Sequence, residues 1–316
     1  MKLPVIDKAL GLHLAVIVVL FALQFVLPAY YHGNLARIMV LAVFALGYNI
    51  AFGYTGLLSL GHALFFSAGM YATGMVMRTL EWSAMSGLLA GIVGGAIVAG
   101  IIGLLALRTT GVAFMIVTLM FAQAGYLTIL YFNAFTRGDE GFVITRAARA
   151  IAGFDLSEPT TRYFMALALF AVCLLVKLAL VRSPAGRVLV SIRENEERTK
   201  MLGYNPFTYK LLALVISGLF AGAAGAMYAL LFGYVGATFA TIQYSIFPLL
   251  WVLLGGAGTV LGPFLGTAFM FYLIDLTSEL TNAYMLVVGI VLVLLVLWVP
   301  KGILGAIRER LAPWLP

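Results

Sequence analysis

The stretch Arg182–Lys210, RSPAGRVLVSIRENEERTKMLGYNPFTYK, is the segment of this chain in which charged side chains crowd together. It holds six Lys/Arg and three Glu residues, and long apolar runs precede and follow it. The hydrocarbon core of a bilayer does not accept such a segment, whereas the cytoplasmic loops of membrane proteins collect Lys and Arg. We therefore expect this segment to lie in water on the cytoplasmic side of a membrane, where a soluble partner can reach it.

The composition of the whole chain is that of a protein embedded in lipid. Of its 316 residues, 63% are hydrophobic and 10% are charged, and the mean hydropathy is +1.08; a typical soluble domain has roughly 25% charged residues. The net charge of +7 is attributed to membrane topology, because no basic face is interleaved with stacking aromatic residues, and no nucleic acid partner is expected. The single cysteine, Cys173, excludes an intramolecular disulfide framework and a cysteine-rich metal site.

Apolar runs near the length of about 20 residues that crosses a bilayer recur along the chain. They predict an all-α polytopic membrane protein with about ten transmembrane helices, in one domain covering residues 1–316. The N-terminal run is expected to be a retained helix rather than a cleaved signal peptide. The predicted spans are Gly11–Ala29, Leu35–Ala51, Leu57–Met77, Ser86–Leu107, Val112–Phe132, Tyr163–Val181, Leu211–Phe232, Ser245–Gly255, Gly262–Leu280 and Tyr284–Val299.

The distribution of basic residues predicts that the N- and C-termini are both cytoplasmic. Twelve of the 19 Lys/Arg residues, Lys2 among them, are then inside, and the short inner loops carry the stronger signal. The loop 134–162 is outside and the loop 183–209 is inside. Lys177 lies near an inner helix end, where it is expected to snorkel toward water. The six cations placed outside are Arg37, Arg78, Arg137, Arg146, Arg149 and Arg162.

Two glycine-rich segments interrupt the apolar runs: GYTGLLSLGHALFFSAGMYATG (Gly53–Gly74) and LGGAGTVLGPFLGTA (Leu254–Ala268). Irregular backbone at membrane depth persists only where protein or a water-filled cavity surrounds it. Both segments are therefore candidates for lining a translocation path, with helix packing as the alternative. The predicted path residues are Gly53, Gly56, Ser59, Gly61, His62, Phe65, Gly255, Gly258 and Gly262.

Elsewhere, the glycine pairs Gly91/Gly95 and Gly218/Gly222 have the spacing that brings helix backbones close together in lipid. We interpret them as packing contacts between helices. His62 has no metal-ligand partners at useful spacing, so no metal site is expected.

Asp275 and Glu279 lie one helical turn apart near the outer end of a predicted span. Ionisable residues at such positions are functional candidates. They leave an alternative open, in which the chain is an ion-coupled secondary transporter or channel that acts without an ATPase partner. The sequence has no Walker motif and no catalytic motif, so we expect neither enzymatic activity nor a bound cofactor in this chain.

Within the charged segment, SIRENEERTKMLG is predicted to form one short amphipathic helix with Ile192 and Met201–Leu202 as its apolar contacts. Gly203 suits a helix end and Pro206 prevents continuation. A short helix outside the membrane, flanked by spans, is suited to insert into a groove of a soluble protein. The alternative is a solvated loop whose charges only fix topology.

Taken together, GYTGLLSLGHALFFSAGMYATG, IRENEERTKMLGYNPFTYKLLALVISGLFAGAAGAMYA, LLGGAGTVLGPFLGTA and the terminal PKGILG resemble the LivM-type permeases of bacterial branched-chain amino acid ABC importers. The resemblance covers nearly the whole chain. It implies a permease subunit of the bacterial inner membrane that moves branched-chain or related neutral amino acids into the cytoplasm by alternating access. The implied partners are a LivH-type permease subunit, two cytoplasmic ATPase subunits that hydrolyse ATP, and an extracytoplasmic amino-acid-binding protein.

On the pattern of this family, residues 183–209 resemble the cytoplasmic coupling loop that docks on the ATPase. The chain departs from the pattern at Arg198 and Thr199, where family members often have small alanines, and at Arg137 and Glu140 in the outer loop. Relatives of the family also move urea, short amides or other amino acids, so the cargo stays open among these. The residues implied in coupling are Arg193, Glu194, Asn195, Glu196, Leu202 and Gly203.

Overall fold

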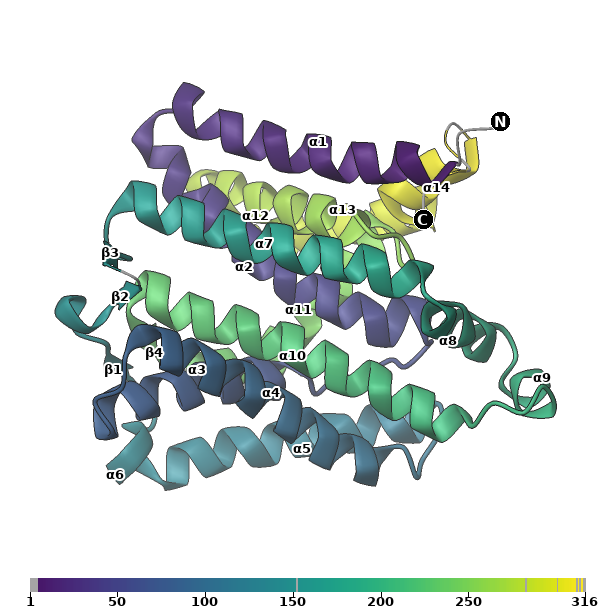
Figure 1. Cartoon of the computed structure of the whole chain (residues 1–316), viewed down its shortest axis with the longest axis horizontal. Helices are drawn as coiled ribbons and strands as arrows, with labels where there is room; N and C mark the ends of the chain where they lie inside the picture. The colour runs from purple at the N-terminus through teal and green to yellow at the C-terminus, as the bar shows by residue number, and fades with distance from the viewer. Residues whose placement is uncertain are drawn as a thin grey trace.

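The computed structural model describes residues 5–151, 153–281, 283–299, 301–310, 312 and 314. Lys2, counted above among the cytoplasmic cations, and Pro300, which begins the PKGILG motif, lie outside these residues. The chain is built almost entirely of helices arranged side by side (Figure 1). The helices are α1 (Val5–Val26), α2 (Ala29–Asn49), α3 (His62–Thr79), α4 (Ala84–Ala106), α5 (Val112–Tyr131), α6 (Asn133–Thr136), α7 (Pro159–Arg182), α8 (Pro184–Glu194), α9 (Glu196–Met201), α10 (Pro206–Phe232), α11 (Ile242–Gly255), α12 (Gly262–Leu280), α13 (Tyr284–Trp298) and α14 (Gly302–Arg310).

Each of the ten predicted apolar segments lies on one of these helices, namely α1–α5, α7 and α10–α13. In the described part of the chain, six helices are long and apolar enough to cross a membrane: α1, α2 with its extension to Tyr54, α4, α5, α7 and α10. The all-α polytopic membrane class is therefore confirmed. The prediction was poorest for Leu57–Met77, since residues 57–61 are not helical and α3 begins only at His62.

The two ends of the bundle differ in their connections. The start of α1 lies at the same end as α8, α9 and α14, whereas α6 and the strands lie at the opposite end (Figure 1). There β1 (Phe142–Val143) pairs antiparallel with β4 (Tyr234–Val235), and β2 (Ala150–Ile151) pairs with β3 (Phe154–Asp155). The β1–β4 pairing ties the loop between α6 and α7 to the segment that follows α10, whereas the β2–β3 pairing lies within that loop.

The central helix of the bundle is α2. Every side chain from Leu35 to Ala51 except that of Arg37 is buried, and α7, α10, α11 and α12 pack around it. A helix that is apolar on all sides is stable only when other elements surround it. Arg37 lies within α2, which begins at Ala29; its location outside the membrane stays a prediction.

Glycines set the close packing of α3, α4 and α10, as their spacing predicts. A Cβ atom on Gly95 would lie 2.6 Å from the Gly218 carbonyl oxygen and 2.6 Å from the Gly222 Cα. A Cβ on Gly222 would lie 2.6 Å from the Gly91 carbonyl oxygen. The interpretation of these glycines as packing contacts is confirmed, because any side chain there would force the helices apart.

The peripheral helices expose large apolar side chains on their outer faces. Val18 of α1 is 63% exposed, Met120 of α5 61% and Leu286 of α13 63%. Contiguous apolar surface of this extent is not found on soluble monomers, but in a bilayer the lipid chains cover it. These faces and the apolar spans agree with a multi-pass membrane protein.

Replacing Gly222 with alanine is expected to destabilise the bundle by about 1–3 kcal/mol, because the added methyl group meets the backbone of α4 rather than a movable side chain. The measurement is the thermal unfolding midpoint of the purified chain in detergent. Gly289→Ala on α13 is the matched control, since a Cβ there meets no atom within 4 Å. Equal midpoints for the two variants would contradict the packing role.

Candidate functional site

The loop between α7 and α10 begins with a capped helix. The hydroxyl of Ser183 accepts a hydrogen bond from the Gly186 N–H at 3.2 Å, and Pro184 occupies the first turn of α8. Serine before proline is a strong helix start, because the hydroxyl satisfies a backbone donor and proline needs none. The apolar face of α8, which includes Val188, Leu189 and Ile192, is buried against the bundle.

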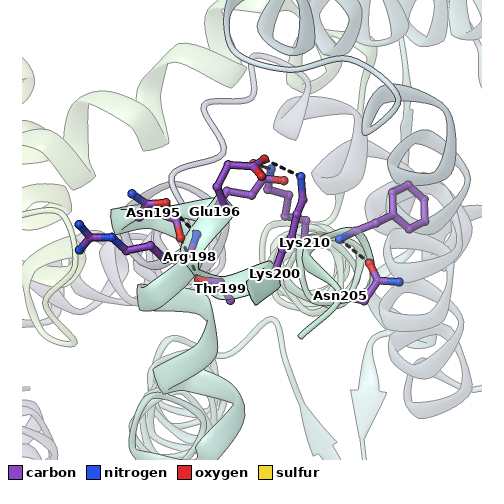
Figure 2. A network of polar contacts seen from close by, with 9 residues as sticks. Asn195, Glu196, Arg198, Thr199, Lys200, Asn205 and Lys210 are labelled. Atoms are coloured by element: carbon purple, nitrogen blue, oxygen red, sulfur yellow. Dashed lines mark hydrogen bonds and ion pairs between the residues drawn. The ribbon is translucent and has the colours of Figure 1, made fainter. Parts of the chain in front are cut away.

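The prediction of one continuous helix over SIRENEERTKMLG is wrong. Helix α8 ends at Glu194, Asn195 is extended, and α9 runs only from Glu196 to Met201. The Asn195 Oδ1 accepts a hydrogen bond from the Arg198 N–H at 2.9 Å (Figure 2). Asparagine is among the best N-capping residues, so it stabilises a new helix start in preference to continuing the old helix.

Polar contacts hold α9 to the start of α10. The Lys210 Nζ lies 2.6 Å from the Glu196 Oε2, and Asn205 caps α10 by accepting from the Phe207 N–H at 3.1 Å (Figure 2). The Lys210 side chain is only 14% exposed, which shields this ion pair from water more than a surface pair. The short α9 therefore has a fixed orientation relative to α10.

The tip of the loop presents apolar side chains to the surroundings. Met201 is 85% exposed and Leu202 is 74% exposed, whereas Ile192 is 4% exposed. Gly203 follows with a φ of +88° and closes α9. The loop thus uses α8 to attach to the bundle and α9 to carry Met201 and Leu202 beyond it.

The two glycine-rich segments form turns that meet inside the bundle. Helix α2 continues as the π-helix η1 (Ile50–Tyr54), and a non-helical stretch leads to α3. The second turn lies between α11 and α12. The buried Asn49 amide joins them: its Nδ2 donates to the Thr259 carbonyl oxygen at 2.7 Å, and its Oδ1 accepts from the Gly258 N–H at 3.0 Å.

Two of the predicted path residues, Gly53 and Gly258, come together at this junction. A Cβ on Gly53 would lie 2.5 Å from the Gly258 nitrogen and would overlap the Asn49 side chain. Only glycine lets the π-helix approach the second turn so closely. We call the contact between Asn49, Gly53 and residues 258–259 the turn junction.

Three cations from different elements donate to carbonyl oxygens at or beside the turn junction. Arg193 of α8 donates to the Gly53 oxygen, and Arg308 of α14 donates to the Gly258 oxygen at 3.3 Å. Lys177 of α7 places its Nζ 3.4 Å from the oxygens of Thr259 and Val260. Gly53 lies in the last turn of η1, and Gly258 follows the end of α11; the backbone dipole at a helix C-terminus favours positive charge.

Lys177 corrects an expectation from the sequence. Its side chain does not snorkel to water but is fully buried, and its ammonium lies 5.7 Å from the centre of the Tyr54 ring. Carbonyl oxygens and an aromatic face compensate a buried ammonium better than apolar groups do. The non-helical second turn is what supplies these free carbonyls.

The other predicted path residues take part in contacts between helices. Gly56, with a φ of +76°, lies against the Arg193 side chain, and Gly255 contacts Gly262 where α11 meets α12. The Tyr48 hydroxyl donates to the Ser59 oxygen at 3.1 Å. The remaining three are buried or closely packed: Gly61 against Thr118, His62 Nε2 at 2.8 Å from the Ser217 Oγ, and Phe65 beside the His62 ring.

These contacts agree with a packing role for the glycine-rich segments. Lining of a path by the nine residues stays a prediction. Nearby, a cavity of about 590 Å³ lies between the second turn and α14, lined among others by Thr259, Lys301 and Arg308.

The two carboxylates proposed as an ion site, those of Asp275 and Glu279, lie in different surroundings. Asp275 lines a cavity of about 320 Å³ that Arg37 also lines. Glu279 is exposed and is not among the lining residues. The sequence places these two acids together, whereas in the structure Asp275 shares a cavity with Arg37, a cation far away in the chain.

Sequence reasoning missed Asn49, Lys177 and Arg308 as members of one site. The available signal was the polar character of Asn49 and Lys177 within apolar runs, since such groups in lipid need partners. The partner that both groups share, the Thr259 oxygen, lies 82 residues after Lys177 and 210 residues after Asn49 in the chain.

We expect Asn49→Ala to destabilise the chain by about 1–3 kcal/mol, because it removes both hydrogen bonds and leaves the Gly258 N–H buried without a partner. The measurement is again thermal unfolding in detergent. The control is Gln243→Ala, an amide that is exposed near the start of α11. A loss no larger than that of the control would show that the turn junction does not depend on the Asn49 amide.

Comparison with known proteins agrees with this architecture. Residues 30–297 match the family described as "Branched-chain amino acid transport system / permease component". The chain is 31% identical over 300 residues to the "High-affinity branched-chain amino acid transport system permease protein LivM" of Salmonella typhimurium (strain LT2), which covers 86% of this chain and 69% of that protein. The protein of the same name from Escherichia coli (strain K12) is 30% identical over 301 residues, with the same coverage.

Similarity extends to a second type of permease. The chain is 25% identical over 287 residues to the "High-affinity branched-chain amino acid transport system permease protein LivH" of Salmonella typhimurium, covering 84% of this chain and 91% of that protein. No solved structure matches the chain. The family match over residues 30–297 and the identity to LivM proteins over most of the chain confirm the resemblance read from the sequence, and the chain belongs to the branched-chain amino acid transport system permease family.

Proposed function

We propose that this chain is the LivM-type transmembrane subunit of an ATP-binding-cassette importer that moves branched-chain or related neutral amino acids into the cytoplasm. The observation that carries the proposal is the identity to LivM permeases over 86% of the chain, since the names of these relatives state that cargo. The chain forms one permease domain in the bacterial inner membrane. It crosses the membrane with ten helices and has both termini in the cytoplasm.

The orientation follows from the positions of the charged loop and the strands. The 183–209 loop, with three Arg and one Lys, and α14, with two Arg, lie at one end of the bundle (Figure 1). Positive loops stay in the cytoplasm. The loop 134–162 then faces the outside, where an extracytoplasmic binding protein delivers the amino acid.

The 183–209 loop is the docking element for one of two cytoplasmic ATPase subunits. Its tip carries Met201 and Leu202 into water, and exposed large apolar side chains beside charged ones are typical of a protein interface. Glu194, Asn195, Glu196 and Gly203 shape and surround this tip. The ATPase subunits hydrolyse the ATP, and this chain itself carries out no chemical reaction.

Arg193 has a different role from the one that its sequence pattern implies. Its guanidinium is directed to the Gly53 oxygen rather than to the tip of the loop. Displacement of α8 by the ATPase is therefore transmitted to η1, and through Asn49 to the second turn. This connection links ATP-driven closure to the rearrangement of α2, α3, α11 and α12 that alternating access requires.

The second permease subunit of the importer is of the LivH type. The 25% identity between this chain and LivH supports a pair of subunits with a common fold, packed around one path. The competing function is an ion-coupled transporter or channel that works alone. It assigns no task to the exposed tip of α9, and its proposed ion site at Asp275 and Glu279 is not brought together on one cavity.

Cysteine crosslinking in native membranes tests the docking surface. In a Cys173→Ser background, Leu202→Cys is expected to crosslink to an ATPase subunit, because its side chain stands free at the tip. Leu80→Cys, 54% exposed near the start of α4 at the opposite end of the bundle, is the matched control and is expected to give no such product. Proton-driven uptake by the purified chain alone, with no crosslink from Leu202→Cys, would favour the ion-coupled alternative.

Substitution of Arg193 tests the transmission of movement. Arg193→Met is expected to keep ATP hydrolysis by the reconstituted importer but to lower leucine uptake per ATP at least about tenfold, because the link from α8 to Gly53 is lost. Arg187→Met is the control, since Arg187 is an exposed cation on the same helix. Unchanged coupling in Arg193→Met would refute the transmission role while leaving the docking surface intact.

A further inference from the structure

The cavity shared by Arg37 and Asp275 lies among five helices. Its lining comes from α2, α10, α11, α12 and the start of α13. Arg37 follows the start of α2, and Asp275 precedes the end of α12, so the cavity lies toward the end of the bundle that carries the strands (Figure 1). Its volume of about 320 Å³ is in the range of small-molecule sites, roughly 300–1,000 Å³.

The walls of this cavity are largely apolar. The rings of Phe247 and Trp251 stack with their centres 5.9 Å apart and their planes at 9°. Phe271, Leu41 and Ile274 add further apolar surface. Walls of this kind favour an aliphatic group, because its transfer from water buries apolar area.

Arg37 lines this largely apolar cavity, and within the described ranges no ion pair joins it to an acidic residue. Its guanidinium lies 5.0 Å from the centre of the Phe232 ring, and its Nε is buried and has no hydrogen-bond partner in the described part of the chain. It is also the one side chain of the stretch 35–51 that is not fully buried. A cation held by an aromatic face and left with free donors is ready to receive an anion.

Asp275 is the complementary charge. Among the residues that the structure describes, no group donates to its carboxylate, and no ion pair joins it to Arg37 or to any other cation. Opposite charges that line one cavity in a low-dielectric environment attract strongly, and a solute that bridges them gains from both. The cavity therefore offers one anion-binding and one cation-binding group with apolar surface between them.

We propose that this cavity binds an α-amino acid zwitterion with an aliphatic side chain. The α-carboxylate lies on the Arg37 guanidinium, whose fork of donors matches a carboxylate. The ammonium lies on Asp275, and the aliphatic side chain packs against Phe247, Trp251 and Phe271. The proposal rests on the proposed function and deepens it, since it gives the path a recognition site within this subunit.

Other ligand classes satisfy this site less well. A simple anion leaves Asp275 without a partner and is repelled by it, and a simple cation does the same to Arg37. Urea, a short amide or a lipid chain carries no charge for either group. A buried charge without a partner is costly, so the pairing of both charges selects the zwitterion.

The first test uses the unmodified protein, purified with its permease and ATPase partners in nanodiscs but without the binding protein. Binding of radiolabelled leucine is expected, and isoleucine and valine are expected to compete. Leucinamide, which lacks the carboxylate, and 4-methylpentanoate, which lacks the ammonium, are expected to compete at least about tenfold more weakly. Equal competition by either analogue, or no binding of leucine, would overturn the proposal.

The second test assigns the binding to this cavity. Arg37→Gln and Asp275→Asn are each expected to weaken leucine binding at least about tenfold, whereas Glu279→Gln, an exposed carboxylate one turn further on α12, is expected to leave it unchanged. In Arg37→Gln, leucinamide is expected to compete about as well as leucine. Arg37→Lys, which keeps the charge, is expected to restore part of the affinity.

Thiol labelling within the cavity tests the site even if these variants fold poorly. In a Cys173→Ser background, the thiol of Ser278→Cys lines the cavity, and leucine is expected to slow its labelling by a maleimide. Labelling at the same rate with and without leucine would overturn the site. Wild-type KM for ATP-dependent uptake by both Arg37→Gln and Asp275→Asn would also refute the site, whereas absence of any ATP-dependent leucine uptake by the unmodified importer would refute the proposed function instead.

Discussion

The structure depends on hydrogen bonds to the backbone carbonyl and amide groups that are left free in the α2–α3 and α11–α12 connections. Helices α2 and α11 end within the bundle, and in a medium without water their free carbonyl and amide groups must find partners in the protein. The Asn49 amide supplies one donor and one acceptor to the second turn. The cations Arg193, Lys177 and Arg308 donate to further carbonyl oxygens of the two turns. The α2–α3 and α11–α12 connections can be irregular only because of these contacts.

The same contacts join the interrupted helices to α8 and α14. Arg193 belongs to α8 and Arg308 to α14, and both helices lie beyond the ends of the long spans (Figure 1). A change in the position of α8 therefore acts on the Gly53 carbonyl directly, not through a series of loosely packed side chains. Because Asn49 joins the two turns, the proposed movement of α8 acts on the α2–α3 pair and the α11–α12 pair together. An energy-coupled permease needs such a connection between its cytoplasmic surface and its central helix.

The amino-acid sequence predicts the helices well and their partners poorly. Apolar runs and the glycine pairs Gly91/Gly95 and Gly218/Gly222 are local signals, and each gave the correct helix or contact. The Asn49 contacts join residues 209 and 210 positions apart, which no local pattern encodes. The break at Asn195 reflects its strong preference for the N-cap position, which competes with the helix-forming residues on both sides. Lys177 was assigned to water because its carbonyl partners exist only after the second turn has folded.

Lys177, which is fully buried, and Arg37, which is partly buried, differ in how far the protein compensates their positive charge. Lys177 is surrounded by carbonyl oxygens and an aromatic ring, so its charge is compensated within the protein and stabilises the second turn. Arg37 lies over the Phe232 ring, and its Nε has no hydrogen-bond partner among the residues that the structure describes, so its charge is compensated less completely. A chain selected only for stability would pair Arg37 with Asp275 or replace both with apolar residues. In the site proposed here, two opposite charges that line one largely apolar cavity without forming an ion pair in the described part of the chain are instead available to a zwitterion.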